Sequence, residues 1–576
     1  MAHKEENRAL PIGVSDFKEI REYNYCYVDK TKLISEFLKS GSKVSLFTRP
    51  RRFGKTLNMS MLKNFLDCNS PSSKSLFSGL KIESEDNGKY LEHMNKYPVF
   101  FITLKSLEFL NYEDFTAALN QRLAVEFEKF KYLLDSEHIS EDQKARFKRI
   151  KSEQATRVDL ISSLQFICHI LFAHHKVKPI LLIDEYDAPI HSAFQTGQYE
   201  ECIQFMRALF SNALKDNDSL QKAALTGILR VAKESIFSDL NHIEILTVVS
   251  PNYANFFGLT EDELKKLIVE YHLEQDFTQV KYWYNGYQFG SHSSIYNPWS
   301  ILSWLKNSEH EFKSYWLNTS SNELVRSLFF KHKETFQEDI FKILSGENIT
   351  ICLSEDLHFP SLQTNCSSED YLTLLLHSGY LTVKNKEFKQ SKFWYTLGIP
   401  NEEIKIIFSN MMELLVKQVA PNLNRNISQE IFSALEKNDT QLFEKYFSDV
   451  VQQVMSYHDF AKQPENAFHC FTAGFLSWLS HDYEVRSNRE TGEGRADILL
   501  IPRNNVMPGY IIELKIYKPL KKVKIPPQAA ITKNLNLALK QIEEKNYIAE
   551  FNARKIKKVT KIAMVFYGKK VWMKWT

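Results

Sequence analysis

Residues 49–56, RPRRFGKT, end in Gly54, Lys55 and Thr56, the residue types that close a phosphate-binding loop. In such a loop, backbone N–H groups at a helix N-terminus surround the phosphates, the lysine reaches the β and γ oxygens, and the Ser or Thr hydroxyl binds Mg2+. The general pattern G-x-x-x-x-G-K-[ST] has glycine where this chain has Arg49, and arginine lacks the freedom of glycine to adopt a positive φ. We therefore expect a loop with a different path, in which arginines supply positive charge: Arg49, Arg51 and Arg52.

An acidic pair further along the chain completes this candidate nucleotide site. The apolar run PILLIDEYD, residues 179–187, predicts a buried strand that ends in Asp184 and Glu185. We expect Asp184 to hold Mg2+ through water, and Glu185 to orient and deprotonate the attacking water. Each motif alone has an alternative, because G-K-T often occurs by chance and acids after an apolar strand are usually solvated. Together they favour one crevice at the carboxyl ends of a parallel sheet.

A third candidate element is LTGILRVAKESIFSDLN, residues 225–241. Thr226, at the end of the next predicted strand, is placed to sense the γ-phosphate. Arg230 is placed to reach the same phosphate within the chain or from a neighbouring subunit. An ordinary strand end followed by a surface arginine explains this pattern equally well.

Acidic residues also occur in strand-like runs near the C-terminus. RADILLIP, residues 495–502, contains Asp497, and GYIIELKIY, residues 509–517, contains Glu513 and Lys515 at E-x-K spacing. Alternation along a strand places Glu513 and Lys515 on one face. On paired strands, Asp497 and Glu513 would share one Mg2+, while Lys515 stabilises charge or positions water, as phosphodiester cleavage requires.

Two further polar residues are candidates for the same site. Glu465 opens the preceding helix and could add a metal ligand, although the helix dipole alone favours an acid there. Gln541 lies on the predicted helix after the E-x-K strand and is expected to face the site, with a surface glutamine as the alternative.

The elements that must position these residues alternate in type. KVSLFT, residues 43–48, predicts a strand before the phosphate-binding loop, and residues 55–65 have helical periodicity. Further apolar runs alternate with amphipathic helices, which predicts a mainly parallel sheet covered on both faces. These runs lie at 98–104, 179–187 and 221–229. After residue 465, the predicted order is a helix, three strands, a helix and a strand.

The 576 residues predict a multidomain α/β protein. We expect an α/β domain over 1–255, a mostly helical connecting domain over 256–455, and a second α/β domain over 456–576. Aromatic residues are concentrated within the connecting domain, at 281–316.

The charge of the chain is uneven. The formal net charge is +3, but residues 515–576 carry 16 Lys plus Arg against 3 Glu, so this segment is at +13 and the rest at −10. A basic terminal segment favours a polyanion such as DNA, with a solvated lysine-rich face as the alternative. The 7 cysteines are scattered, and no signal peptide or long apolar run occurs, which predicts a soluble cytoplasmic protein with no membrane association.

With these motifs in place, the chain resembles a bacterial and archaeal family that fuses an AAA-ATPase-like domain to a C-terminal PD-(D/E)XK nuclease superfamily domain. The resemblance covers nearly the whole chain in an ordered series of motifs, which includes TRPRRFGKTLNMSML, LLIDEYDAPI, WYNGYQFG, SNRETGEGRADI, IIELK and ALKQI. The loop of this family begins R-P-R-R-F-G-K-T, so Arg49 agrees with it.

The resemblance implies an ASCE-type P-loop ATPase core that binds ATP and Mg2+. Its Walker A residues would be Gly54, Lys55 and Thr56, and its Walker B residues Asp184 and Glu185. The resemblance also implies five nuclease-motif positions, which are Glu465, Asp497, Glu513, Lys515 and Gln541.

The leading hypothesis is an ATP-dependent or ATP-gated, Mg2+-dependent nuclease that cleaves DNA in defence against mobile elements. A first alternative is a nucleotide-switched module whose nuclease-like domain binds nucleic acid or protein without cleavage. A second is a non-enzymatic assembly module in which the aromatic patches of 281–316 form a partner surface. Each hypothesis is compatible with a homo-oligomer.

Overall fold

The computed structural model describes most of the chain. The described residues are 7–70, 73–107, 109–230, 243–316, 323–331, 333–344, 346–354, 359, 362, 366–419, 427–454, 464–477, 479, 482–491, 494–504, 506–519 and 525–576. The chain forms two compact units, of which the first is Met1–Leu328 with Ile351–Tyr395 and the second is Phe329–Thr350 with Thr396–Thr576. The division into three domains at 255 and 455 stays a prediction.

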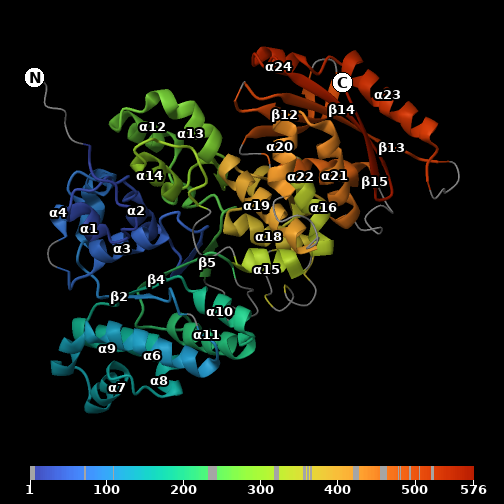
Figure 1. Ribbon diagram of the computed structural model, residues 1–576. Coiled ribbons are helices and arrows are strands. Elements are labelled where there is room, and N and C mark those ends of the chain that lie inside the picture. The colour runs from blue at the N-terminus through green and yellow to red at the C-terminus, as the bar shows by residue number, and fades with distance from the viewer. Residues whose placement is uncertain are drawn as a thin grey trace, which may run out of the picture. The chain divides into compact units, whose positions relative to one another are not determined.

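A five-stranded parallel sheet forms the centre of the first unit (Figure 1). Its order is β2-β3-β4-β1-β5. The strands are β1 (Val44–Thr48), β2 (Val99–Thr103), β3 (Ile180–Asp184), β4 (Lys222–Gly227) and β5 (Ile243–Leu246). Every residue of β1 and β3 is buried, as an apolar run without alternation predicts. Because neighbouring strands run parallel, the carboxyl ends of β1, β3 and β4 meet at one edge of the sheet.

Helices cover both faces of this sheet. In Figure 1, α3 (Lys55–Leu66) lies on one side of the strands, and α6 (Tyr112–Glu128) with α9 (Ser163–His175) lies on the other. The other helices of this part are α1 (Phe17–Glu22), α2 (Lys32–Lys39), α4 (Lys74–Phe77), α5 (Lys81–Ser84), α7 (Glu141–Lys151), α8 (Arg157–Ile161), α10 (Ala188–Thr196) and α11 (Tyr199–Leu214). The predicted α/β architecture is thus confirmed for this unit.

Local sequence signals set the starts of several helices. The side chain of Asn111 accepts a hydrogen bond from the backbone N–H of Asp114 and caps α6, whereas Ser140 and Gln143 form a capping box at α7. Helix α3 differs, because it begins after Gly54 in the left-handed conformation, at φ +83°, with no side-chain cap. Its first N–H groups therefore face no capping side chain, which is the arrangement that suits an anion.

The rest of the first unit follows β5. It contains α12 (Glu261–Glu270), α13 (Phe277–Tyr284), β6 (Tyr287–Phe289), β7 (His292–Ile295), α14 (Pro298–Lys306), α18 (Ser368–Ser378), and the hairpin strands β9 (Thr382–Lys389) and β10 (Lys392–Gly398), of which β10 ends in the second unit. Strands β6 and β7 pair with each other, whereas β8 (Ile349–Cys352), β10 and β9 form a three-stranded sheet in that order.

Most aromatic residues of the 281–316 segment belong to the core. Tyr284, Tyr296 and Trp304 are wholly buried, and Trp283 and Trp316 are nearly so. The second alternative, in which these aromatic patches form a partner surface, is therefore wrong for these side chains. They pack inward because large rings stabilise a folded domain most when they are removed from water.

The second unit contains a five-stranded sheet of order β11-β12-β13-β14-β15. The strands are β11 (Tyr483–Thr491), β12 (Gly494–Pro502), β13 (Gly509–Ile516), β14 (Val559–Tyr567) and β15 (Lys570–Trp575). Only β13 and β14 run parallel, and α23 (Gln528–Glu544) with α24 (Ala549–Ala553) connects them. The remaining helices are α15 (Glu323–Lys331), which begins in the first unit, and α16 (Lys333–Leu344), α19 (Glu402–Val419), α20 (Ile427–Glu436), α21 (Thr440–Val454) and α22 (Pro464–Leu476).

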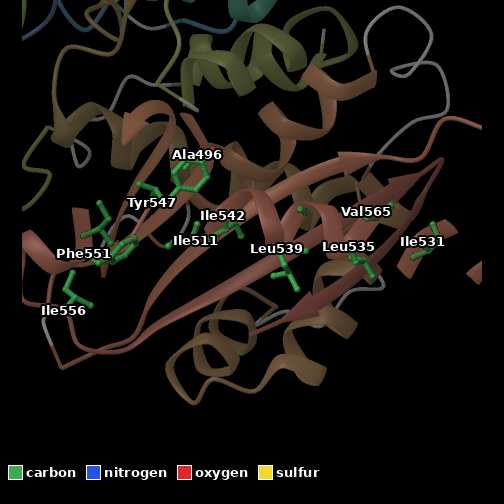
Figure 2. Packing of buried hydrophobic residues seen from close by; sticks show 14 residues of the cluster. Ala496, Ile511, Ile531, Leu535, Leu539, Ile542, Tyr547, Phe551, Ile556 and Val565 are labelled. Atoms are coloured by element: carbon green, nitrogen blue, oxygen red, sulfur yellow. The ribbon is translucent and has the colours of Figure 1, made fainter. Parts of the chain in front are cut away.

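The core of this sheet lies beneath α23 (Figure 2). Ile531, Leu535 and Ile542 of α23 pack over Ile511 of β13 and Val565 of β14. On the opposite face, α22 packs through Phe468, whose ring stacks on Phe566 with 4.3 Å between centroids. The mixed sheet is therefore covered by α23 on one face and by α22 on the other. No helix among the described residues has the length and apolar character needed to cross a membrane.

Candidate nucleotide site and acidic site

The phosphate-binding loop joins the carboxyl end of β1 to α3. Two of its residues adopt the left-handed conformation, Arg52 at φ +69° and Gly54 at φ +83°. An arginine in this conformation is strained, whereas glycine adopts it without steric cost. Positive φ therefore occurs at Arg52 and Gly54, and not at Arg49, where the general pattern has its first glycine. The loop thus follows a different path, as the sequence led us to expect.

Lys55 is buried and bonds the backbone of its own loop. Its Nζ donates to the carbonyl oxygens of Arg49 and Pro50, each at 2.9 Å. Burial lowers the pKa of Lys55 to about 8, although the nearby carboxylates of Glu185, Asp187 and Asp184 act in the opposite direction. A buried ammonium beside a phosphate-binding turn is the donor that a phosphate oxygen requires.

Asp184 links three elements of the site. Its Oδ2 accepts a hydrogen bond from Thr56 Oγ1 at 2.9 Å, and its Oδ1 accepts one from Thr226 Oγ1. Asp184 and Thr226 are buried at the carboxyl ends of β3 and β4. The structure therefore brings together the three residues predicted for the metal and the γ-phosphate. A hydroxyl and a carboxylate are the oxygen ligands that Mg2+ prefers.

Glu185 follows Asp184 in the left-handed conformation, at φ +53°. Its backbone N–H donates to Thr226 Oγ1 at 3.2 Å. Burial raises the pKa of the Glu185 carboxyl, while Lys55 opposes this shift and Asp184 adds to it. A raised pKa makes a carboxylate a better proton acceptor near neutral pH, as a general base requires.

Arg49 does not reach toward these groups. Its guanidinium is wholly buried and donates from Nη1 to the carbonyl oxygens of Thr48 at 2.8 Å and Leu246 at 2.6 Å. It also lies over the rings of Phe257 and Phe289, with 5.0 Å and 5.4 Å from Cζ to the centroids. Burial lowers the pKa of Arg49 to about 9. These contacts correct the expected contact with a nucleotide, because the side chain ties the loop to β5 and its flanking segments instead.

The other predicted arginines differ in surroundings. Arg51 is partly buried, and burial lowers its pKa although the carboxylates of Asp187 and Glu185 oppose the shift. Arg52 is exposed and lies 4.2 Å above the ring of Trp299, measured from Cζ to the centroid. Arg51 therefore shares the electrostatic environment of the site, whereas Arg52 is engaged by an aromatic ring. Arg230 is partly buried just after β4.

Asp187 is a residue of this site that sequence reasoning missed. Its Oδ2 accepts the backbone N–H groups of Ile228 and Leu229 at 2.8 Å and 2.9 Å, and lies 3.5 Å from His191 Nε2. Burial alone would raise the pKa of Asp187, but the His191 and backbone contacts outweigh burial and lower it. Asp187 thus fixes the backbone that follows Thr226, and the third acid of IDEYD was the signal that could have revealed it.

The acidic site of the second unit lies on two paired strands. In the antiparallel register of β12 and β13, Ile498 is opposite Ile512, which places Asp497 opposite Glu513. The backbone N–H of Leu514 donates to Asp497 Oδ2 at 2.7 Å. Glu513 is 1% exposed and Asp497 is partly buried. The strand pairing therefore brings the two predicted carboxylates together.

Lys515 and Gln541 complete the described part of this site. Lys515 Nζ donates to Glu513 Oε1 at 3.0 Å and to Gln541 Oε1 at 2.7 Å. Because Gln541 lies on α23, this contact places the carboxylate, the amine and the amide on the face of the sheet that α23 covers. The sequence-based placement of Gln541 beside the E-x-K strand agrees with these distances.

Glu513 carries the strongest electrostatic perturbation in this cluster. Burial, followed by the nearby Asp497 carboxylate, raises the pKa of Glu513 to about 8, although Lys515 opposes the shift. Its Oε2 is buried and has no hydrogen-bond partner among the described residues. A buried carboxylate oxygen without a donor is costly, and a metal ion would satisfy it. The donor set therefore fits a divalent cation.

The metal ligands are not complete within the described residues, which contain no cluster of three acidic, His or Cys side chains arranged for a metal ion. Glu465 lies in the first turn of α22, and its side chain is outside the described residues. The glycine-containing turn around 492–493 also lies outside them. Water commonly supplies the remaining ligands of Mg2+, which is bound by one or two carboxylates in many sites.

Two further residues next to this site were missed from the sequence. His469 of α22 contacts the backbone oxygen of Asp497 through Nε2 at 2.9 Å, so Nε2 carries the proton in this contact. Tyr547 is buried and hydrogen-bonds Gln541, and its ring packs in the cluster of Figure 2. His469 thus contacts the backbone of Asp497, and Tyr547 contacts the side chain of Gln541. The spacing of Tyr547 six residues after Gln541 gave no distinctive signal.

Comparison with known proteins gives two family matches. Residues 11–237 match the family described as "Predicted AAA-ATPase", and residues 463–576 match the "PD-(D/E)XK nuclease superfamily". The chain is also similar to a protein of Azotobacter chroococcum mcd 1 named "Uncharacterized protein in vnfD 5'region". The two are 24% identical over 555 residues, which cover 95% of this chain and 94% of that protein. The two matched segments contain the two sites described above.

Proposed function

We infer that this chain, which joins an AAA-ATPase-like domain to a domain of the PD-(D/E)XK nuclease superfamily, hydrolyses ATP and cleaves DNA in a Mg2+-dependent reaction. The observation that carries the nuclease half is the buried, unpartnered Oε2 of Glu513, placed opposite Asp497 and bonded through Oε1 to Lys515. The observation that carries the ATPase half is the hydrogen bond between Thr56 and Asp184, which joins the phosphate-binding loop to the acidic strand end.

In the nucleotide site, Lys55 would exchange its bonds to the loop carbonyls for bonds to the β and γ oxygens of ATP. Thr56 and Asp184 would hold Mg2+, directly and through water. Glu185, whose pKa is raised, would accept a proton from the attacking water. Bound Mg2+-ATP supplies the γ-phosphoryl group and the positive charge that stabilises its transfer. Thr226 holds the Asp184 carboxylate in place from the neighbouring strand.

In the acidic site, Asp497 and Glu513 would hold Mg2+. The bound metal polarises the phosphodiester and lowers the pKa of a water molecule, as in other metal-dependent phosphodiesterases. Lys515 would stabilise negative charge on the phosphate or position the water, and Gln541 orients its ammonium group through the 2.7 Å hydrogen bond. Glu465 stays a candidate for a further ligand.

The test is cleavage of a panel of nucleic acids by the full-length protein. The panel contains supercoiled plasmid, linear duplex, single-stranded DNA and RNA, each with Mg2+ in the presence and absence of ATP. We expect cleavage of DNA by the wild type and none by Asp497→Ala, whereas Lys55→Ala loses ATP hydrolysis. The exposed acid Glu543 serves as a matched control, because it lies on α23 and Glu543→Gln should cleave as the wild type does. Absence of cleavage in every nucleotide state would contradict the nuclease half.

A second candidate function is a nucleotide-switched module that binds nucleic acid or protein without cleaving it. It is favoured by the absence of a third metal ligand among the described residues. It predicts that Lys55→Ala abolishes ATP binding while no preparation cuts DNA. The same panel separates the two functions, because the module retains nucleic-acid binding without strand breaks.

Four finer proposals accompany this function. We propose domains over 1–255, 256–455 and 456–576, with the nucleotide state controlling access to the acidic site. The biological role would be defence against mobile elements, and a homo-oligomer would allow Arg230 to act on a neighbouring subunit. Sedimentation with and without ATP tests the oligomer, and plasmid or phage challenge of cells that express Asp497→Ala tests the defence role.

A further inference from the structure

An exposed aromatic pair lies at the tip of the hairpin formed by β9 and β10. A two-residue turn joins the strands, and both of its residues, Gln390 and Ser391, have positive φ, at +51° and +61°. This is the geometry of a type I′ turn, whose twist matches that of the strands beside it. The hairpin tip, residues 384–395, is therefore a well-formed structural element that projects its side chains from paired strands.

The two aromatic residues are Phe388 and Phe393, one on each strand. Their ring centroids lie 5.0 Å apart. Phe388 is 65% exposed and Phe393 is 48% exposed, and no other phenylalanine whose exposure the structure describes is exposed. Exposure of a large apolar side chain forfeits about 1.5–3 kcal/mol of burial free energy. An adjacent exposed pair is thus unusual in this chain and indicates a binding surface.

Lysine side chains share the surface of these rings. Lys386 Nζ lies 4.2 Å from the centroid of Phe393 and 5.4 Å from that of Tyr395. Because side chains two apart on a strand point to one face, Lys384, Lys386 and Phe388 line up on the same face of β9. Lysines and aromatic rings therefore lie side by side on one face of the hairpin tip.

The hairpin tip is basic as a whole. It contains four lysines, Lys384, Lys386, Lys389 and Lys392, against the single acid Glu387. Glu387 pairs with Lys389 on the opposite face. None of the other three lysines has an ion pair recorded among the described residues. Lys384 and Lys386 thus leave positive charge at the aromatic face, where it complements a polyanion, whereas Lys392 points to the opposite face.

We propose that the hairpin tip is a binding site for single-stranded nucleic acid, with bases stacked on Phe388 and Phe393 and phosphates contacted by Lys384 and Lys386. Aromatic side chains that accept unpaired bases, next to lysines that follow the backbone, are the two components of sequence-tolerant single-strand binding. The proposal rests on the proposed function only in taking nucleic acid as the polyanion. It adds a site that contains none of the residues of the ATP site or the acidic site.

A single strand fits these observations better than a duplex. The faces of paired bases are stacked within a duplex and are not available to a flat ring on a protein surface, whereas unpaired bases are. A duplex would use only the lysines. The rings would then not contribute to duplex binding. Substitution of the rings therefore distinguishes single-strand binding from duplex binding in an experiment.

The test is binding of a fluorescent oligothymidylate to the full-length protein, followed by anisotropy over a series of NaCl concentrations. The buffer contains EDTA and no ATP, so that neither cleavage nor ATP hydrolysis is needed. Phe388→Ala with Phe393→Ala should weaken binding by about 10-fold or more, because stacking of each base contributes strongly to affinity. The same pair changed to tyrosine keeps its rings and should bind as the wild type does.

The lysines should act through salt dependence instead. Lys384→Ala with Lys386→Ala should lower the slope of log K against log salt by about 1.4, since each phosphate contact to a single strand contributes about 0.7. Lys148→Ala with Lys178→Ala, at two exposed lysines elsewhere in the first unit, should leave the slope unchanged. Tyr23→Ala, at a tyrosine that is 68% exposed, is the corresponding aromatic control.

Three outcomes would overturn the proposal. First, the variant with both rings changed to alanine could bind the oligonucleotide with wild-type affinity. Second, this variant could lose single-strand and duplex binding to the same extent. Third, it could lose binding to anionic vesicles while it keeps its affinity for the oligonucleotide. Thermal unfolding should match the wild type, because the substituted rings are exposed. Failure of the nuclease proposal would look different from failure of this one. In that case Glu513→Gln would cleave DNA like the wild type, or neither protein would cleave DNA, while both would still bind single-stranded DNA.

Discussion

Replacement of Glu513 by glutamine should stabilise the metal-free protein at neutral pH. The carboxyl is 1% exposed and one of its oxygens has no donor among the described residues, so its charged form is disfavoured in the folded state. Burial and Asp497 raise its pKa from 4.5 to about 8. Glutamine keeps an oxygen for Lys515 and removes the charge, which removes this cost.

The sign and size of the effect follow from the pKa shift. Because the folded state holds the proton more tightly than the unfolded chain, wild-type stability falls as pH rises from 4.5 to about 8. Glu513→Gln lacks this ionisation, so its advantage grows over the same interval. At pH 7 the advantage is at most about 3 kcal/mol, from about 1.4 kcal/mol per pKa unit. A folding unit of this size would then gain at most about 10 °C in Tm.

Differential scanning calorimetry in EDTA, from pH 5 to pH 8.5, measures this advantage. Addition of Mg2+ should stabilise the wild type by binding the native state and should have less effect on Glu513→Gln, which reduces or reverses the difference. Glu543→Gln, at an exposed acid of the same sheet domain, should shift Tm little at any pH. A Glu513→Gln variant that is less stable than the wild type at pH 7.5, or whose shift does not depend on pH, would refute the reasoning.

Three other perturbations have defined outcomes. ATP affinity should fall as pH rises through about 8, because Lys55 loses its proton in that range, and isothermal titration of Lys55→Arg should show no such fall between pH 7 and 9. Arg49→Ala should cost about 2–4 kcal/mol of stability by leaving buried carbonyl oxygens without a donor, while ATP affinity measured in the folded protein changes little. Tyr547→Phe should lower DNA cleavage by up to about 10-fold through loss of one hydrogen bond to Gln541, with ATP hydrolysis unaltered, and an unchanged cleavage rate would exclude that positioning role.

The sequence was sufficient to predict most residues of the two candidate sites because each of those residues lies in or beside a short run that forms one strand, loop or helix. The runs at 43–48 and 179–187 correspond to β1 and β3, and parallel pairing through β4 brings their carboxyl ends together. In the second unit, the runs containing Asp497 and Glu513 became neighbouring strands, so alternation alone placed Lys515 on the face of Glu513. The predicted fold class and the predicted family fusion are confirmed.

Long-range packing accounts for what the sequence could not predict. The guanidinium of Arg49 donates to the carbonyl oxygen of Leu246 and lies over the rings of Phe257 and Phe289. These three residues are distant in the chain, so no local sequence pattern predicts the burial of Arg49. The aromatic residues of 281–316 illustrate the same difficulty, because the sequence pattern of clustered rings is the same in a buried core and on an exposed surface. The last strand, β15, was missed because it is short and lysine-rich at the edge of the sheet.

Strand breaks produced in supercoiled plasmid, compared between the wild type and Glu513→Gln at a fixed Mg2+ concentration, test the central claim most directly. The comparison uses a variant that should be at least as stable as the wild type in EDTA, so lost activity cannot be attributed to unfolding. We predict that the wild type converts supercoiled plasmid to nicked and linear forms in Mg2+ and not in EDTA, while Glu513→Gln leaves it supercoiled in both. Equal cleavage by the two proteins, or none by the wild type with any nucleotide, would contradict the assignment of Asp497, Glu513 and Lys515 to phosphodiester cleavage.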